Sequence, residues 1–176
     1  FSKGLVTIHD ILFETHPQYF STFFKLRSRI LIKYAARKSE HIFSVSNYSK
    51  NAIVKNYNLD SEKVTVIYNA ASKIFSNTKN NDSFIAKFSL ESNNYLLTVG
   101  RNDVRKNYHS LIKAYSIIQD KVPPLVIIDS SSERFSLIKT IGRYDLQGKI
   151  KIISNVNNKV LSAIYRNATL FIYPSY

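Results

Sequence analysis

Cysteine and methionine are both absent from the 176 residues of this sequence. Without cysteine the protein has no disulfide framework and no thiolate metal site, and this composition fits a reducing compartment. Because the sequence does not open with methionine, we expect a natural start to be missing, through processing or because the chain is a piece of a longer protein. Long apolar runs are absent too, since none approaches the roughly 20 residues that span a bilayer.

Acidic residues are scarce in this sequence. There are 12 of them against 25 basic residues, and the formal net charge is +13. So strong a bias favours an anionic partner, which is a nucleic acid, an anionic membrane surface or a phosphorylated substrate. A lysine-rich and asparagine-rich composition inherited from an AT-rich genome explains the same charge, and the sequence leaves both explanations open. Hydrophobic residues make up 44%, which is enough for a folded core.

Apolar strands alternate with amphipathic helices along the whole chain. We expect strands at 5–8, 42–45, 64–67, 95–99, 125–128, 150–153 and 169–173. We expect helices at 20–38, 48–56, 84–88, 107–119, 133–144 and 159–167. This alternation predicts an α/β protein with parallel sheets. A polar, turn-rich stretch at 76–83 separates two halves, so we expect domains at residues 1–70 and 71–176.

Two cations follow the fourth expected strand. Gly100 and Arg101 end that strand, and Lys106 and Asn107 precede the next expected helix. In such folds ligands bind beyond the carboxyl ends of the strands, and a helix N-terminus offers N–H groups and partial positive charge to anions. Arginine grips oxygens as a fork and lysine acts as a movable point charge, so these residues form a candidate diphosphate site. An exposed loop with ordinary solvated cations is the competing interpretation, and spacing alone favours it.

His9 and Asp10 follow the first expected strand. A histidine there can hydrogen-bond a sugar hydroxyl, with Asp10 fixing its tautomer or the neighbouring backbone. The alternative is a turn in which Asp10 caps the following segment. We expect no metal site, because His16 and His41 lack ligand-like spacing with His9 and cysteine is absent. GxSxG, Walker A and GxGxxG motifs are also missing, so hydrolase, ATPase and dinucleotide-binding functions have no support.

Several segments, in this order and spacing, resemble those of glycosyltransferase family 4, whose members have the GT-B fold. They are TIHD, SVSNYSKNAI, VTVIYNA, LLTVGRNDVRKNYHSLIKAY, VLSAIYRNA and TLFIYPSY. The resemblance implies two Rossmann-like parallel-sheet domains. It also implies a retaining glycosyltransferase without a bound metal or cofactor, whose donor substrate is a nucleotide-diphosphate-sugar. We therefore expect glycan or lipid-linked acceptors, a role in bacterial polysaccharide or lipopolysaccharide biosynthesis, a cytoplasmic location and no nucleic-acid partner.

The resemblance also implies roles for individual residues. Arg101 and Lys106 match the pair that holds the donor diphosphate, and Gly100 and Asn107 stand beside them. Such cations act most strongly in the transition state, because the leaving group gains charge as the glycosidic bond breaks. His9 matches the catalytic-site histidine that faces the sugar and the acceptor across the cleft.

The remaining expected donor contacts come from later in the sequence. Val156 lies in the turn at 155–157, which matches the region whose backbone contacts the nucleotide base. Pro174 and Ser175 match the opening of the donor loop. The resemblance makes residues 1–70 the last part of the acceptor-side domain and residues 71–176 the first part of the donor-binding domain.

Three departures from the family pattern matter. Asp129 and Ala70 stand where the family has glycines, and Asp129 argues against close phosphate approach at its loop. The sequence ends at Tyr176, before the acidic, glycine-rich segment and the glutamate that bind the donor sugar and ribose, so we expect it to be inactive as it stands. The competing functions are a non-catalytic basic module, either a degenerate transferase or a nucleic-acid binder, and a GT-B enzyme of another class such as an epimerase.

The basic helix expected at 20–38 has two interpretations. Its apolar positions include Phe20, Phe23, Ile30 and Tyr34, and six lysines and arginines occupy other positions. In the first, the helix lies on the anionic inner face of the cytoplasmic membrane, where lipid-linked acceptors sit. In the second, it packs on the first sheet and its basic face is solvated. The sequence alone favours the packed helix.

Overall fold

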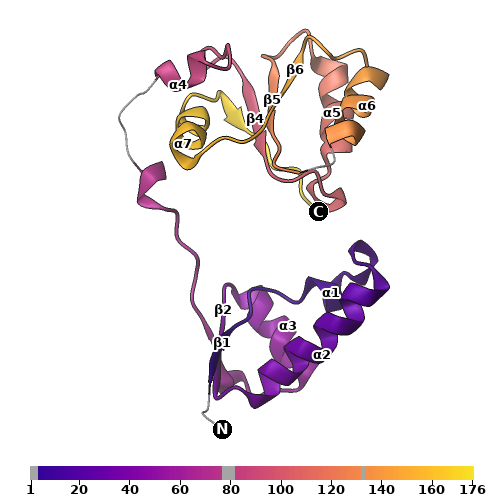
Figure 1. The fold of residues 1–176 in the computed structure, drawn as a ribbon, viewed down its shortest axis with the longest axis vertical. Coiled ribbons are helices and arrows are strands. Elements are labelled where there is room, and N and C mark those ends of the chain that lie inside the picture. The colour runs from indigo at the N-terminus through magenta and orange to yellow at the C-terminus, as the bar shows by residue number, and fades with distance from the viewer. Residues whose placement is uncertain (1–3, 77–81, 132–133) are drawn as a thin grey trace. The chain divides into compact units, whose positions relative to one another are not determined.

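The computed structural model describes residues 4–76, 82–131 and 134–176. The chain divides into two compact units, which are unit 1 (1–71) and unit 2 (72–176). This division lies one residue beyond the expected boundary at 70/71. Figure 1 shows that each unit contains its own sheet and its own helices. Among the described residues, no helix is both long enough and apolar enough to cross a membrane.

Unit 1 is built around a three-stranded parallel sheet of order β1-β2-β3. Its elements, in chain order, are β1 (Leu5–Thr7), α1 (Leu12–Thr15), η1 (Pro17–Tyr19), α2 (Thr22–Lys38), β2 (His41–Ser44), α3 (Asn47–Tyr57), η2 (Ser61–Lys63) and β3 (Val64–Val66). Val6, Ile42 and Val64 stand in register across the strands and belong to one hydrophobic core with residues of α2 and α3. Helices therefore cover this face of the sheet, as Figure 1 shows.

Local signals position the helices of unit 1. Ser46 caps α3 by accepting a hydrogen bond from the Ser49 N–H at 3.1 Å, as serine does at helix N-termini. The same helix ends at Asn58, which adopts the left-handed conformation with φ 51°. Ser21 caps α2 through the N–H of Phe24 at 3.4 Å. The serine and asparagine positions thus set where these helices begin and end.

The expected packing of α2 is wrong in its detail. Only Ala36 is fully buried in this helix, and Ile32 packs partly against the core. Phe23, Ile30 and Tyr34 are 77%, 62% and 66% exposed. The helix does lie on the sheet, but it uses its small and medium residues for that contact, and its large apolar side chains lie on the outside.

Unit 2 is built around a four-stranded parallel sheet of order β6-β5-β4-β7. Its elements are η3 (Lys73–Phe75), α4 (Asp82–Ala86), β4 (Leu96–Val99), η4 (Val104–Lys106), α5 (Tyr108–Ile118), β5 (Leu125–Ile128), α6 (Arg134–Arg143), β6 (Ile150–Ile153), α7 (Asn158–Arg166) and β7 (Leu170–Phe171). The crossovers between neighbouring parallel strands pass through helices, as the alternating sequence pattern predicts.

Both faces of this second sheet are covered. Leu125 and Ile127 of β5 face a core shared with α5 and α6, while Val126 and Ile128 face one shared with α4 and α7. Figure 1 shows these helix pairs on opposite sides of β4, β5 and β6. A continuous apolar strand is typical of a sheet buried on both faces.

The inner face of α5 is narrower than its sequence suggests. Leu111, Ile112 and Tyr115 are buried, as expected of a helix that packs on the sheet. Ala114 and Ile118 also fit an apolar face in the sequence, but both are exposed. At 100° per residue Ala114 lies beside the buried stripe, whereas Ile118 is nearly in line with Leu111 and is the last residue of the helix.

Candidate functional site

The carboxyl edge of the unit 2 sheet holds most of the expected site residues. Gly100 follows β4, Asp129 follows β5, and the turn with Asn155 and Val156 follows β6. These residues help to line a pocket of about 340 Å³. Open α/β sheets bind ligands at this edge. The structure therefore brings Gly100 and Val156, which lie 56 positions apart in the sequence, to the wall of one pocket.

Gly100 lets the Lys106 side chain pass close to the backbone. A Cβ atom at Gly100 would lie 3.1 Å from the Tyr108 hydroxyl and 3.7 Å from Lys106 Cε. Tyr108 is only 3% exposed, and burial raises the pKa of its hydroxyl to about 12, so this neighbour stays neutral. Any larger residue at position 100 has to displace the tyrosine that supports this wall.

Lys106 reaches the end of β7. Its ammonium nitrogen lies 4.4 Å from the centroid of the Tyr173 ring and donates a hydrogen bond to the Tyr173 hydroxyl. Ser175 donates a hydrogen bond to the carbonyl of Arg105 at 3.0 Å, and the Tyr176 N–H donates to the same carbonyl at 3.0 Å. These contacts join the segment at Pro174 and Ser175 to the turn that carries Lys106. The sequence resemblance assigned both segments to the donor site, and the structure places them side by side.

A short 3-10 turn, η4, aims Lys106. Asp103 caps this turn through the Arg105 N–H at 2.9 Å and forms an ion pair with the Arg105 guanidinium at 2.8 Å. The hydrogen bond from Arg105 lowers the pKa of Asp103 from its ordinary value. Asn107 then adopts the left-handed conformation, with φ 55° and ψ 35°, and turns the chain into α5. The sequence predicts a helix start at this place but not the 3-10 turn, although aspartate is a preferred residue at helix N-caps.

The N-terminus of α5 points its first N–H groups toward the Lys106 turn. The side chain of Asn107 makes no capping hydrogen bond to α5. Arg101 is exposed, and its carbonyl accepts a hydrogen bond from the Asp103 N–H at 2.8 Å. An uncapped helix start, an arginine and a lysine at one edge of the sheet form a setting that favours an anion with several oxygens.

Asp129 is a residue whose contribution the sequence did not reveal. It is fully buried, and its carboxylate accepts hydrogen bonds from the Asn102 N–H at 3.0 Å, the Ser131 N–H at 2.9 Å and the Ser131 hydroxyl at 2.8 Å. Asn102 directly follows Arg101. The side chain therefore ties the loop after β4 to the loop after β5, instead of leaving the close backbone approach that a glycine allows. No sequence signal distinguishes such an inward carboxylate from a solvent-facing one.

His9 belongs to unit 1 and lies at the carboxyl end of β1, where its side chain is exposed. Asp10 accepts a hydrogen bond from the Leu12 N–H at 3.0 Å. The aspartate therefore caps the following turn, which was the alternative that the sequence left open. Ser46, at the end of the neighbouring strand, uses its hydroxyl as the α3 cap. His9 thus stands at the sheet edge where such folds bind ligands.

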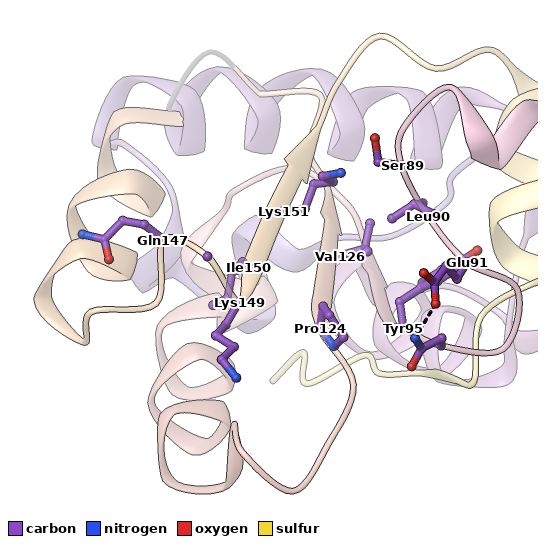
Figure 2. A pocket seen from close by; sticks show the side chains of 12 residues that line it. Ser89, Leu90, Glu91, Tyr95, Pro124, Val126, Gln147, Lys149, Ile150 and Lys151 are labelled. Atoms are coloured by element: carbon purple, nitrogen blue, oxygen red, sulfur yellow. Dashed lines mark hydrogen bonds between the residues drawn. The ribbon is translucent and has the colours of Figure 1, made fainter.

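A second pocket lies at the opposite, amino edge of the unit 2 sheet. It has a volume of about 370 Å³, and Figure 2 shows Tyr95, Pro124 and Ile150 in its wall, at the starts of three strands. Its charged groups are engaged with the protein itself. Glu91 accepts from the Asn94 amide at 2.8 Å, and Lys149 pairs with Asp120 at 3.4 Å. None of the expected site residues lines this pocket, so the carboxyl edge is the better candidate.

Two family models match the chain. Residues 80–176 match the model described as glycosyl transferases group 1, and residues 3–72 match the model described as glycosyltransferase family 4. The first match alone covers more than half of the 176 residues. The chain belongs to the glycosyl transferases group 1 family. This confirms the family that the sequence motifs indicate.

Two curated relatives of this chain are O-antigen chain mannosyltransferases. RfbU of Salmonella typhimurium is 32% identical over 172 residues, which cover 97% of this chain and 45% of the relative. O-antigen chain mannosyltransferase B of Escherichia coli is 25% identical, and its match covers 99% of this chain and 47% of the relative. The chain therefore spans about half the length of the curated relatives that it matches.

Solved structures share the fold. A glycosyltransferase from Rickettsia africae matches with a TM-score of 0.73 and 19% identity, over 97% of this chain and 45% of that one. Anabaena HepE in complex with UDP-glucose matches with a TM-score of 0.75 and 21% identity, over 97% and 46%. Sucrose-phosphate synthase from Thermosynechococcus elongatus matches with a TM-score of 0.76 and 18% identity, over 98% and 44%. These neighbours confirm the expected α/β, GT-B fold class.

Proposed function

We propose that this group 1 protein transfers a sugar from a nucleotide-diphosphate-sugar to a glycan or lipid-linked acceptor in polysaccharide or O-antigen biosynthesis. The observation that carries the proposal is the meeting of four features at one sheet edge. The turn after β4 brings together Gly100, Lys106, the start of α5 and Ser175. Two further supports are the names of the relatives, which are O-antigen mannosyltransferases, and the UDP-glucose bound in the HepE structure.

Unit 2 is the donor side in this proposal. Arg101 and Lys106 contact the diphosphate, and the N–H groups at the start of α5 add partial positive charge. The backbone of Val156 contacts the nucleotide base from the far wall of the pocket. These preorganised charges favour the transition state over the bound donor, because the departing diphosphate becomes more negative as the glycosidic bond breaks. The protein cations supply this stabilisation, so the proposed reaction needs no bound metal.

Unit 1 is the acceptor side in this proposal. His9 ends β1 with an exposed imidazole, which is able to donate or accept a hydrogen bond to a sugar hydroxyl. We carry over from the family resemblance that the reaction retains the configuration at the anomeric carbon. Measuring the anomeric configuration of the first-formed product by NMR tests retention independently of the binding roles.

Steady-state kinetics of the complete enzyme test the diphosphate roles. Arg101→Ala and Lys106→Ala should each lower kcat/KM by about a hundredfold or more, as the loss of one transition-state charge contact does in other enzymes. Lys113→Ala, on the exposed side of α5, is the matched control and should keep parental kinetics. GDP-mannose is the first donor to test, because the two relatives are mannosyltransferases. Parental kinetics in both the Arg101 and Lys106 variants would disprove the diphosphate assignment.

The alternative of a non-catalytic basic module is not favoured by the comparisons. It nevertheless makes a distinct prediction. Binding through many nucleic-acid phosphates falls steeply as salt rises and does not discriminate among nucleotide sugars. If binding shows this salt dependence and no preference for any nucleotide sugar, the non-catalytic alternative replaces the transferase proposal.

A further inference from the structure

Two hydroxyl groups are buried beside the Lys106 turn without a partner. Thr98 of β4 is fully buried, and Tyr108, the first residue of α5, is almost fully buried. Among the described residues, neither hydroxyl has a hydrogen-bond partner. A buried polar group that makes no hydrogen bond destabilises the folded state. Phenylalanine at position 108 would fill the same space with its ring and avoid that loss, so the Tyr108 hydroxyl needs a physical reason.

Other buried tyrosines of this protein have partners for their hydroxyls. The Tyr95 hydroxyl donates a hydrogen bond to the Ile164 carbonyl at 2.6 Å. The Tyr115 hydroxyl, near the other end of α5, lies 3.2 and 3.3 Å from two backbone carbonyls. In the described part of unit 1, the Tyr57 hydroxyl also lacks a partner, but it lies near the charged ion pair between α1 and α2. Tyr108 thus differs from the other buried tyrosines of unit 2.

The Tyr108 hydroxyl lies against the glycine of the candidate diphosphate site. It is 3.1 Å from the point where a Cβ atom at Gly100 would stand, and Lys106 Cε and Cδ are 3.7 and 3.8 Å from the same point. The hydroxyl and the lysine stem therefore share one side of Gly100. Burial raises the pKa of Tyr108 to about 12, and the nearby Thr98 hydroxyl acts against that rise. The tyrosine keeps its proton at neutral pH and is able to donate a hydrogen bond.

An anion held at the Lys106 turn would come next to this hydroxyl. The Lys106 ammonium and the uncapped start of α5 both favour negative charge there. The methylene groups of Lys106 pack beside the hydroxyl, so binding has to turn this part of the stem aside, and such chains rotate readily between staggered conformations. The ammonium has three N–H donors, so it keeps its hydrogen bond to the Tyr173 hydroxyl while it contacts the anion.

We propose that Tyr108 is a further donor-binding residue, whose hydroxyl donates a hydrogen bond to an oxygen of the nucleoside diphosphate while Thr98 donates one to Tyr108. Both buried hydroxyls then have a partner. The inference rests on the proposed function, because its ligand is the same diphosphate. It adds a neutral hydrogen-bond donor to the two cations, Arg101 and Lys106.

Tyr108→Phe in the complete protein tests this by two measurements that move in opposite directions. Calorimetric titration of UDP and GDP should show diphosphate binding weakened by about tenfold or more, since hydrogen bonds to charged groups are the strong ones. Without ligand, the thermal midpoint should rise by about 1–3 °C, because the variant buries no unpaired hydroxyl at position 108. A tyrosine that serves only the packing of α5 would not give this combination.

Two further variants serve as controls. Tyr115→Phe removes a hydroxyl that has partners, so the thermal midpoint should fall by about 1–3 °C while UDP and GDP bind as they do to the parent. Thr98→Val removes the second unpaired hydroxyl and should raise the midpoint. It should weaken diphosphate binding by no more than about threefold, because Thr98 acts only through Tyr108.

The outcomes separate this inference from the proposed function. Parental affinity in Tyr108→Phe, with reduced affinity in Arg101→Ala and Lys106→Ala, would overturn the inference and leave the diphosphate site in place. Parental affinity in all three variants would overturn both. A lower thermal midpoint in Tyr108→Phe, or equal losses of affinity in Tyr108→Phe and Thr98→Val, would also overturn the inference, because Tyr108 then supports the wall without contacting the ligand.

Discussion

Replacing Asp129 by alanine should loosen two loops of the donor side at once. The carboxylate accepts hydrogen bonds from the N–H groups of Asn102 and Ser131, which belong to different loops, and from the Ser131 hydroxyl. A buried donor left without its acceptor costs about 1–3 kcal/mol. Two backbone donors are affected in Asp129→Ala. Two effects reduce this cost, because water reaches the partly buried loops and the variant has no carboxylate to desolvate. We therefore expect the local free energy of opening these loops to fall by about 2–4 kcal/mol.

Amide hydrogen exchange measured by NMR reports this loss where it occurs. Because about 1.4 kcal/mol corresponds to a factor of ten, exchange at Asn102 and Ser131 should accelerate by roughly 30-fold or more in Asp129→Ala. Asp129→Asn keeps an oxygen in the place of Oδ1, which accepts from both N–H groups, so its effect should stay below about tenfold. Asp120→Ala removes a carboxylate whose side chain is 84% exposed, and it should leave both amides unchanged.

Two results would refute this reasoning. Unchanged exchange at Asn102 and Ser131 in Asp129→Ala would show that the carboxylate does not hold the loops together. Equal acceleration in the alanine and asparagine variants would show that negative charge, and not the position of a hydrogen-bond acceptor, carries the effect.

The remaining predictions concern the Lys106 turn and its neighbours. Tyr173→Phe removes the hydroxyl that accepts a hydrogen bond from Lys106. Calorimetry should show nucleoside diphosphate binding weakened by about three- to tenfold, while the thermal midpoint of the protein stays unchanged. Gly100→Ala brings a methyl group within 3.1 Å of the Tyr108 hydroxyl and should weaken the same binding, and parental affinity would contradict the close-contact account. Asp103→Asn should lower the thermal midpoint by about 1–2 °C at pH 7, as expected for an exposed ion pair worth roughly 0.5 kcal/mol. The folded-state pKa of Asp103 is lowered, so its contribution to stability is present above the ordinary value of 3.8 and disappears as pH falls through the folded-state pKa. The two midpoints should converge once the pH lies below that folded-state pKa.

Much of the fold is predictable because its signals are local. The run at 125–128 is a strand with the expected limits, because four apolar residues stand between Pro124 and Asp129. Ser46 caps α3 as the sequence indicates, since a serine before a helical pattern satisfies the free N–H groups. Parallel sheets follow from the alternation of strands and helices, so the positions of the strand ends, and with them the candidate site, also follow.

The unpredicted features depend on side-chain direction. Periodicity shows that Phe23, Ile30 and Tyr34 share one side of α2, but it does not show whether that side meets the core or the solvent. Asp129 ends a strand in the sequence, and only the structure reveals that its carboxylate turns inward to two loops. The contact between Lys106 and Tyr173 joins residues 67 positions apart, and no local pattern encodes it.

Calorimetric titration of UDP and GDP into the complete protein tests the central claim most directly. We expect binding of one nucleoside diphosphate, weaker binding of its monophosphate, and at least about tenfold weaker diphosphate binding in Arg101→Ala and in Lys106→Ala. Lys113→Ala should bind like the parent. A diphosphate that binds both site variants as tightly as the parent, or a protein that does not distinguish diphosphate from monophosphate, would contradict a diphosphate site at the carboxyl edge of the unit 2 sheet.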